Sequence, residues 1–130
     1  MSLGDYLENK LLDHLTGNVS FTMPTAYVAL STADPGEGGS TIAEPSGNGY
    51  ARVATSAATW DAAASGAIQN GAAISFPTAS GSWGTITYVA LFDAVSGGNF
   101  MGSGALTAGT AITTDQIARF DVGALDITLT

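Results

Sequence analysis

The sequence contains no cysteine. Disulfide bonds, thiolate metal ligands and cysteine nucleophiles are therefore excluded. Basic residues are also scarce, because three Lys and Arg stand against eleven Asp and Glu, and the net charge is −8. Binding to nucleic-acid phosphates or to an anionic membrane requires a basic surface that so few cations do not provide. We therefore expect neither a nucleic-acid partner nor a membrane partner.

Signals for secretion and membrane insertion are missing as well. The opening residues, MSLGDYLENKLLDHL, have no basic region followed by an unbroken apolar stretch, and no apolar run is long enough to cross a bilayer. This pattern predicts synthesis in a cytoplasm. Charged residues make up only 11% of the chain, about half the usual share. A low-charge surface is typical of interface cores, so we expect contacts between protein subunits and a homo-oligomer.

An amphipathic pattern occupies residues 1–17. The residues Leu3, Leu7, Leu11 and Leu15 recur every fourth position and form one stripe of a helix of about four turns. Gly17 provides a stop for this helix. We expect an N-terminal helix over residues 1–17 that uses these leucines to dock on the body or on a neighbouring subunit. A β-rich domain is expected over residues 18–130.

After Gly17 the apolar period changes to two, which is typical of β-strands. Turn-forming Gly, Pro, Asn and Ser separate the apolar segments. The expected strands are residues 26–32, 50–54, 57–61, 68–76, 85–94, 100–107, 116–121 and 124–129. The sequence therefore predicts a mainly β fold, a compact antiparallel β-sandwich or barrel of about eight short strands.

The tetrapeptide YVAL occurs at residues 27–30 and again at residues 88–91. Its flanking sequences do not align, so we interpret the two copies as two central strands rather than as a duplicated module. In each copy Val and Leu share one face of the strand.

The candidate catalytic and metal-binding residues are few. The only histidine, His14, lies in the predicted helix without a nucleophile elbow elsewhere, and a structural role at the helix end is favoured over a catalytic triad. Asp34, Glu37 and Glu44 share one Gly-rich loop, where clustered acids suit Ca²⁺, but the spacing is not that of an EF-hand. A solvated loop is the favoured interpretation, and we expect no metal or other cofactor. A small hydrolase that uses these acids is a remote alternative.

The remaining candidates have structural interpretations. Arg52 and Arg119 lie in predicted strands, and each is expected to pair with a carboxylate such as Asp93, Asp61 or Asp121. A ligand-binding role for these arginines is the alternative. Trp60 and Trp83 are expected to pack in the core, with sugar stacking as the alternative.

The segments YLENKLLDHLTG, YVALSTADPGEGG, GNGYARVA, ISFPTASGSWGTITYVALFDAVSGGNFMGSGALT and ARFDVGALDITL occur in this order along the chain. Together they resemble a family of small tailed-bacteriophage virion proteins that are commonly labelled tail-fibre-like. The resemblance covers almost the whole chain and implies a non-enzymatic virion component made in the host cytoplasm. It carries no catalytic residues.

Two virion roles follow from this resemblance. The chain has no fibre-forming repeats or heptads, which favours a capsid decoration or cement protein bound to the major capsid protein. The alternative is a tail-fibre or tail-tip adaptor or receptor-binding protein that binds other tail proteins.

Overall fold

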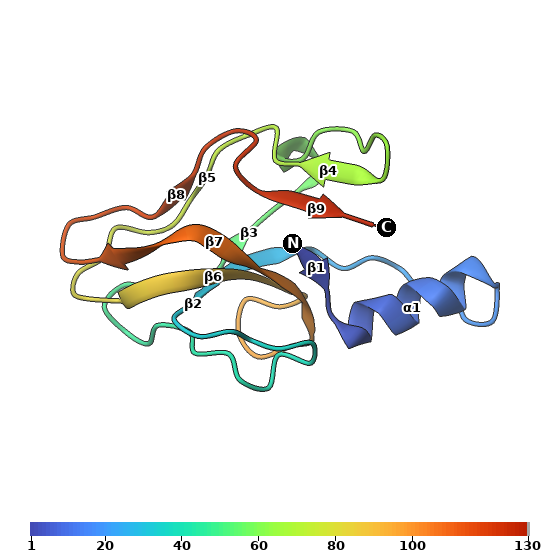
Figure 1. The fold of residues 1–130 in the computed structure, drawn as a ribbon, viewed down its shortest axis with the longest axis horizontal. Helices are drawn as coiled ribbons and strands as arrows, with labels where there is room; N and C mark the ends of the chain where they lie inside the picture. Colours follow the sequence, from blue (N-terminus) through green and yellow to red (C-terminus); the bar gives the residue numbers. More distant parts are fainter. Residues whose placement is uncertain (130) are drawn as a thin grey trace.

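The computed structural model describes residues 1–129 and is mainly β (Figure 1). Its α-helix is α1 (Asp5–Leu15), and a short 3₁₀-helix is η1 (Ala57–Thr59). The strands are β1 (Ser2–Leu3), β2 (Tyr27–Ser31), β3 (Val53–Ala54), β4 (Ala67–Gln69), β5 (Ile74–Ser75), β6 (Gly84–Phe92), β7 (Phe100–Ile112), β8 (Arg119–Phe120) and β9 (Asp126–Thr128). All strand pairs are antiparallel, so the predicted fold class is confirmed.

Five strands form one sheet in the order β1-β7-β6-β2-β3, and two ribbons, β4-β9 and β5-β8, lie over it (Figure 1). The main core lies between these two layers. From the sheet it takes Val28, Leu30, Val89 and Leu91, and from the upper layer Ile74, Phe76 and Leu125. Alternating side chains of a strand point to opposite faces, which explains why Val and Leu of each YVAL reach the same core.

The two YVAL segments are hydrogen-bonded neighbours. Val28 lies opposite Leu91, Ala29 opposite Ala90, and Leu30 opposite Val89. In an antiparallel pair of identical segments, the Val of one copy lies opposite the Leu of the other. Both strands therefore present Val and Leu to the same face of the sheet. The interpretation as two central strands is therefore correct, and their direct pairing is a finding of the structure.

The other face of the sheet is covered by the segment between β2 and β3. A second, smaller cluster there contains Ala29, Ala90, Phe92 and Phe100, with Ile42 of the covering segment packed against it. The alanines leave room for backbone to approach the sheet. Both faces are thus buried in β2 from Val28 to Ser31 and in β6 from Val89 to Phe92.

Two expected strands are wrong. Residues 57–61 contain η1, because Ser56 and Thr59 form a capping box and the Thr59 hydroxyl accepts the Ser56 N–H at 3.1 Å. Such local side-chain bonds compete with strand pairing. The expected strand over residues 68–76 is interrupted between β4 and β5, since Asn70 is completely buried and turns its amide toward other backbone groups.

The N-terminal helix begins at Asp5 rather than at residue 1. Ser2 and Leu3 form β1, which pairs with Ser103 and Gly102 of β7. A side chain at residue 102 would collide with the Ser2 carbonyl, so glycine permits this close approach. Leu3 is therefore a strand residue, and α1 has 11 residues instead of about four turns. Within residues 1–129 no helix has the length and apolar character needed to cross a membrane.

Candidate functional site

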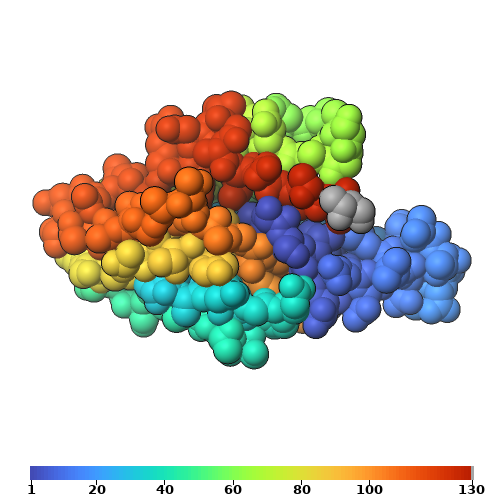
Figure 2. All heavy atoms as spheres, viewed as in Figure 1, coloured from blue at the N-terminus to red at the C-terminus, as the bar shows by residue number. Residues whose placement is uncertain are grey.

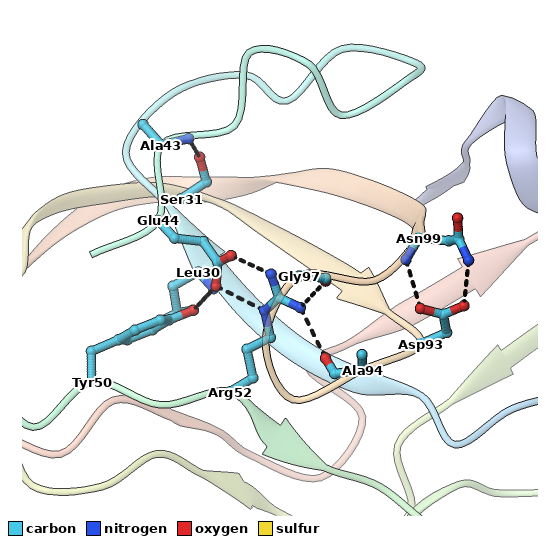
Figure 3. A network of polar contacts seen from close by, with 10 residues as sticks. All are labelled: Leu30, Ser31, Ala43, Glu44, Tyr50, Arg52, Asp93, Ala94, Gly97 and Asn99. Carbon is cyan, nitrogen blue, oxygen red and sulfur yellow. Dashed lines mark hydrogen bonds and ion pairs between the residues drawn. The ribbon is translucent and has the colours of Figure 1, made fainter. Parts of the chain in front are cut away.

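A buried polar cluster lies beside strand β2 (Figure 3). Glu44 forms a two-pronged ion pair with Arg52: its Oε1 lies 2.5 Å from Nη2 and its Oε2 lies 3.0 Å from Nε. The side chain of Arg52 is 6% exposed and that of Glu44 is 21% exposed. This planar, bidentate geometry is the one in which Arg binds carboxylates best.

Tyr50 connects this ion pair to the sheet. Its hydroxyl donates to Glu44 Oε2 at 2.7 Å and accepts the Leu30 N–H at 3.0 Å. Burial raises the pKa of Tyr50 above its ordinary value, and the hydrogen bond to Glu44 adds to this effect. Strand β3 pairs with Tyr27 and Val28 only, so the Tyr50 hydroxyl replaces a backbone acceptor for the Leu30 N–H. Without this bond the buried N–H would be unsatisfied, which costs free energy.

Arg52 also fastens the connection between β6 and β7. Its Nη1 donates to the carbonyls of Ala94 at 2.9 Å and Gly97 at 2.8 Å. Its guanidinium lies 3.6 Å from the ring centre of Phe92, a cation–π contact. These internal bonds occupy the guanidinium, so the cluster joins the connection between β2 and β3 to the connection between β6 and β7.

The same connection is closed by Asp93 and Asn99 (Figure 3). Asp93 accepts the Asn99 backbone N–H at 2.6 Å and its side-chain amide at 2.8 Å. The bond from the Asn99 side chain is the main reason that the pKa of Asp93 lies below its ordinary value. Asp93 therefore stabilises the turn, and the carboxylate that pairs with Arg52 is Glu44, which was not among the expected partners.

Arg119 is in a different environment. Its Nε donates to Asp121, one of the expected partners, at 2.9 Å, but the two side chains are 57% and 81% exposed. Asp61, another suggested partner, instead accepts a hydrogen bond from Gln69 at 3.1 Å. The two arginines thus differ: one is enclosed and the other is accessible.

The three acids suggested for calcium are not brought together. Asp34 accepts the Gly36 N–H and the Tyr88 hydroxyl, and Glu44 is held by Arg52 and Tyr50. Glu37 uses its backbone carbonyl to accept the Asp5 N–H at the start of α1. Among residues 1–129 no group of three or more His, Asp or Glu residues is arranged to hold a metal ion.

The tryptophans and the histidine make internal contacts. Trp83 is 4% exposed, donates to the Asn48 carbonyl at 2.9 Å and packs edge-on against Tyr50. Trp60 is half-buried and donates to the Thr55 hydroxyl at 3.2 Å. His14 is exposed, and its Nδ1 accepts the Phe21 N–H at 3.1 Å. Within residues 1–129, the His14 side chain makes no hydrogen bond to a hydroxyl that could act as the nucleophile of a triad.

Two surfaces are open to contact. The first is the tip of α1, defined here as Leu12, Leu15 and Val19, which are 59%, 80% and 50% exposed. Figure 2 shows the blue atoms of α1 and the following turn extending beyond the body at one end. Of the four leucines predicted as an interface, Leu3 and Leu7 are instead buried in the protein's own core.

The second surface is a groove of about 520 Å³ between β7 and the segment that runs from β8 to β9, called the β7 groove here. Its apolar lining includes Leu30, Ile86, Leu106, Ile112, Phe120 and Leu125, and Arg119 and Asp126 also line it. This groove could not be predicted from the sequence, since it depends on how two segments diverge in space. The role of Tyr50 was not predicted either, although Tyr50 and Arg52 have the spacing of two that places side chains on one face of extended chain.

These features define a small, acidic, mainly β protein whose enclosed ion pair between Glu44 and Arg52 holds its own loops. The family model described as Gp80, podophage GP4 fiber I protein gp80, matches residues 2–128. The chain belongs to this family of phage fibre proteins, and it is a structural component of the virion. The search of curated proteins found no match.

Proposed function

We propose that this protein is a non-enzymatic, compact module of the phage fibre that joins other virion proteins through its apolar surfaces. The observation that carries the proposal is the family match over residues 2–128, whose description is that of a fibre protein. The fold adds a restriction. A compact two-layer domain without repeats does not form an extended shaft by itself, so it fits a joint or terminal unit of a fibre.

A non-enzymatic role is supported by the state of the polar side chains. Glu44 is bound to Arg52 and Tyr50, and Asp34 to a turn and to Tyr88. Catalytic acids need to face a substrate and have a pKa suited to proton transfer. These acids instead complete internal hydrogen bonds.

Capsid decoration is the second candidate, and it is favoured by the compact fold and the small number of charged residues. In this role the partner would be the major capsid protein. The fibre role instead implies contacts with tail proteins. Both roles require a structural protein of the virion, and they differ in how many copies each particle carries.

The number of copies per virion tests the fibre role. We expect quantitative mass spectrometry of purified particles to give a count far below that of the major capsid protein. Cross-linking of intact particles should join the chain to tail proteins. A count close to that of the major capsid protein, with cross-links to it, would reject the fibre role and establish capsid decoration.

A further inference from the structure

The dipeptide Asn-Gly occurs twice in the chain, at residues 48–49 and at residues 70–71. In such a pair the backbone nitrogen of the glycine can attack the side-chain amide of the asparagine, because both groups belong to one chain and are held close together. Glycine has no side chain to cover this nitrogen, whereas Asn9, Asn18 and Asn99 precede larger residues. The two pairs have the same local sequence, so a difference in their reactivity has to come from the fold.

Asn48 lies in an exposed turn that leaves both reacting groups accessible. Residues 47–49 are exposed and all have positive φ, with Asn48 at 51°. Within residues 1–129 the Asn48 side chain makes one hydrogen bond, from Nδ2 to the Ser82 carbonyl at 3.0 Å, and the Gly49 N–H donates none. The side chain has to give up this one bond to turn toward the Gly49 nitrogen. Such an exposed turn opens at little cost in free energy.

Asn70 lies in the opposite environment, since it is completely buried. Its side chain makes hydrogen bonds to backbone groups of Ala72, Asp121 and Leu125. The attacking nitrogen is occupied as well, because the Gly71 N–H donates to the Thr59 carbonyl at 2.9 Å. Attack at Asn70 therefore requires that the upper layer open and release all of these bonds.

We propose that Asn48 is a site of spontaneous deamidation, and that the fold protects Asn70 from the same reaction. The group that reacts is the side-chain amide, and the co-reactant is water. This inference goes beyond the proposed function and does not depend on it, because it concerns the chemistry of one turn in the chain itself.

The reaction has two steps. In the first, the Gly49 nitrogen bonds to the side-chain carbon Cγ of Asn48, and Nδ2 leaves as ammonia together with the proton that the Gly49 nitrogen gives up. In the second, water opens the cyclic imide. Cleavage of the new bond gives aspartate, whereas cleavage of the original peptide bond gives isoaspartate, in which the main chain runs through the former side chain. No atom changes its oxidation state.

The isoaspartate product changes the surroundings of Trp83. In the native chain the backbone carbonyl of Asn48 accepts the Trp83 indole N–H and the Ser80 N–H, each at 2.9 Å. In isoaspartate this carbonyl becomes a free carboxylate, and the main chain toward Tyr50 takes a longer path. Tyr50 packs edge-on against Trp83, with 5.3 Å between the ring centres. Deamidation therefore places a negative charge beside Trp83 and disturbs its packing.

The first test follows deamidation of the folded chain. Purified protein is incubated in mildly alkaline buffer, and peptide mass spectrometry measures the mass increase that accompanies the exchange of NH₂ for OH. We expect the change at Asn48 to be at least about tenfold faster than at Asn70, since Asn70 reacts only after opening. Asn18 and Asn99 are internal controls and should also react slowly. Equal rates at Asn48 and Asn70 would overturn the proposal, as would an unreactive Asn48.

The second test repeats the incubation in urea, which removes the fold and keeps the sequence. The rate at Asn70 should rise to that at Asn48, because each is followed by glycine, while Asn18 and Asn99 stay slow. An Asn70 that remains unreactive in urea would show that the local sequence, and not burial, protects it.

The third test follows the indole N–H resonance of Trp83 by NMR, assigned by comparison with Trp60→Phe. As the folded chain ages, a second Trp83 resonance should grow in proportion to isoaspartate at residue 48. Asn48→Gly is the matched control, because glycine adopts positive φ and keeps the carbonyl but has no amide to lose. This variant should retain a single Trp83 resonance. An unchanged resonance in deamidated wild-type protein would reject the effect on Trp83.

Discussion

The charge of Arg52 is tolerated inside the molecule because its guanidinium N–H groups have acceptors and its flat face has an aromatic partner. Glu44 neutralises it, two carbonyls accept from Nη1, and Phe92 covers its flat face. A buried ion pair contributes little net stability, but loss of one partner leaves the other charge uncompensated. Removal of Arg52 is therefore expected to lower the free energy of unfolding by more than the ion pair itself contributes.

Replacement of Arg52 by alanine should lower the free energy of unfolding by about 3 kcal/mol, since Glu44 and two carbonyls lose their partner. Arg119→Ala is the matched control, and removal of this exposed pair should cost at most about 1 kcal/mol. Urea denaturation of the two variants measures both values. Equal losses would contradict the assigned difference in burial.

Tyr50 gives the fold a dependence on alkaline pH. Its pKa is raised in the folded state, so the stability gained from the neutral phenol is complete below the ordinary tyrosine pKa of about 10 and decreases as the pH rises above it. We expect the Tm of the wild type to fall above pH 10. In Tyr50→Phe the Tm should be lower at neutral pH and should fall less steeply.

Tyr88→Phe controls for the general effect of alkaline pH. The pKa of Tyr88 is also raised, by its hydrogen bond to Asp34, but Tyr88 is less enclosed. Its replacement should change the alkaline fall in Tm less than Tyr50→Phe does. The reverse order would contradict the role of burial at Tyr50.

At the scale of elements, strands with many apolar or β-branched residues were predictable and polar interruptions were not. Strand β6 and its partner β2 could be predicted from their near-continuous apolar segments, because a strand that packs on both faces needs apolar side chains on both. The break at Asn70 did not follow, since an alternating sequence looks the same whether Asn70 points to a neighbouring strand or into the core. Likewise, the pairing of Glu44 with Arg52 depends on a loop path that spacing alone does not determine.

Asn70 organises the upper layer around itself. Its amide donates to the carbonyls of Ala72 and Asp121, and its side-chain oxygen accepts the Leu125 N–H, each at 2.9 Å. These bonds hold the turn between β4 and β5 against the segment between β8 and β9. One buried side chain thus joins the two ribbons.

Replacement of Asn70 by alanine should lower the free energy of unfolding by about 3 kcal/mol or more, because buried donors and acceptors lose their partners. Hydrogen exchange should show faster exchange in β4, β5 and β9 than in β6. Gln69→Ala is the control, since Gln69 makes one exposed bond to Asp61 and should cost below about 1 kcal/mol. Uniform acceleration over the whole chain would contradict a local role for Asn70.

At the scale of the whole molecule, the N-terminal segment belongs to the body. The sequence predicts a separate helix over residues 1–17, but β1 completes the edge of the sheet and Leu3 and Leu7 are in the core. The apolar stripe alone did not reveal this division, because its spacing is the same in the covered and the uncovered part. Of the helix α1, the end around Leu12 and Leu15 is the part that remains exposed.

Deletion of residues 1–17 should therefore destabilise the β-rich domain itself, because it removes core side chains and a strand. We expect a Tm at least several degrees lower, measured by differential scanning calorimetry. Leu15→Glu is the control that changes the exposed tip and should leave the Tm nearly unchanged. A deleted chain as stable as the wild type would show that residues 1–17 form a separate unit.

The pairing of the two YVAL strands also has a consequence for folding kinetics. Strand β2 leaves the ribosome long before β6, its main partner, has been synthesised. Such non-local pairing is slow, and an unpaired apolar strand is exposed to aggregation during the delay. Because YVAL complements a second YVAL in antiparallel register, the unpaired β2 of another nascent chain is nearly as good a partner as the chain's own β6. The match that stabilises the centre of the sheet therefore makes correct folding depend on keeping nascent chains apart.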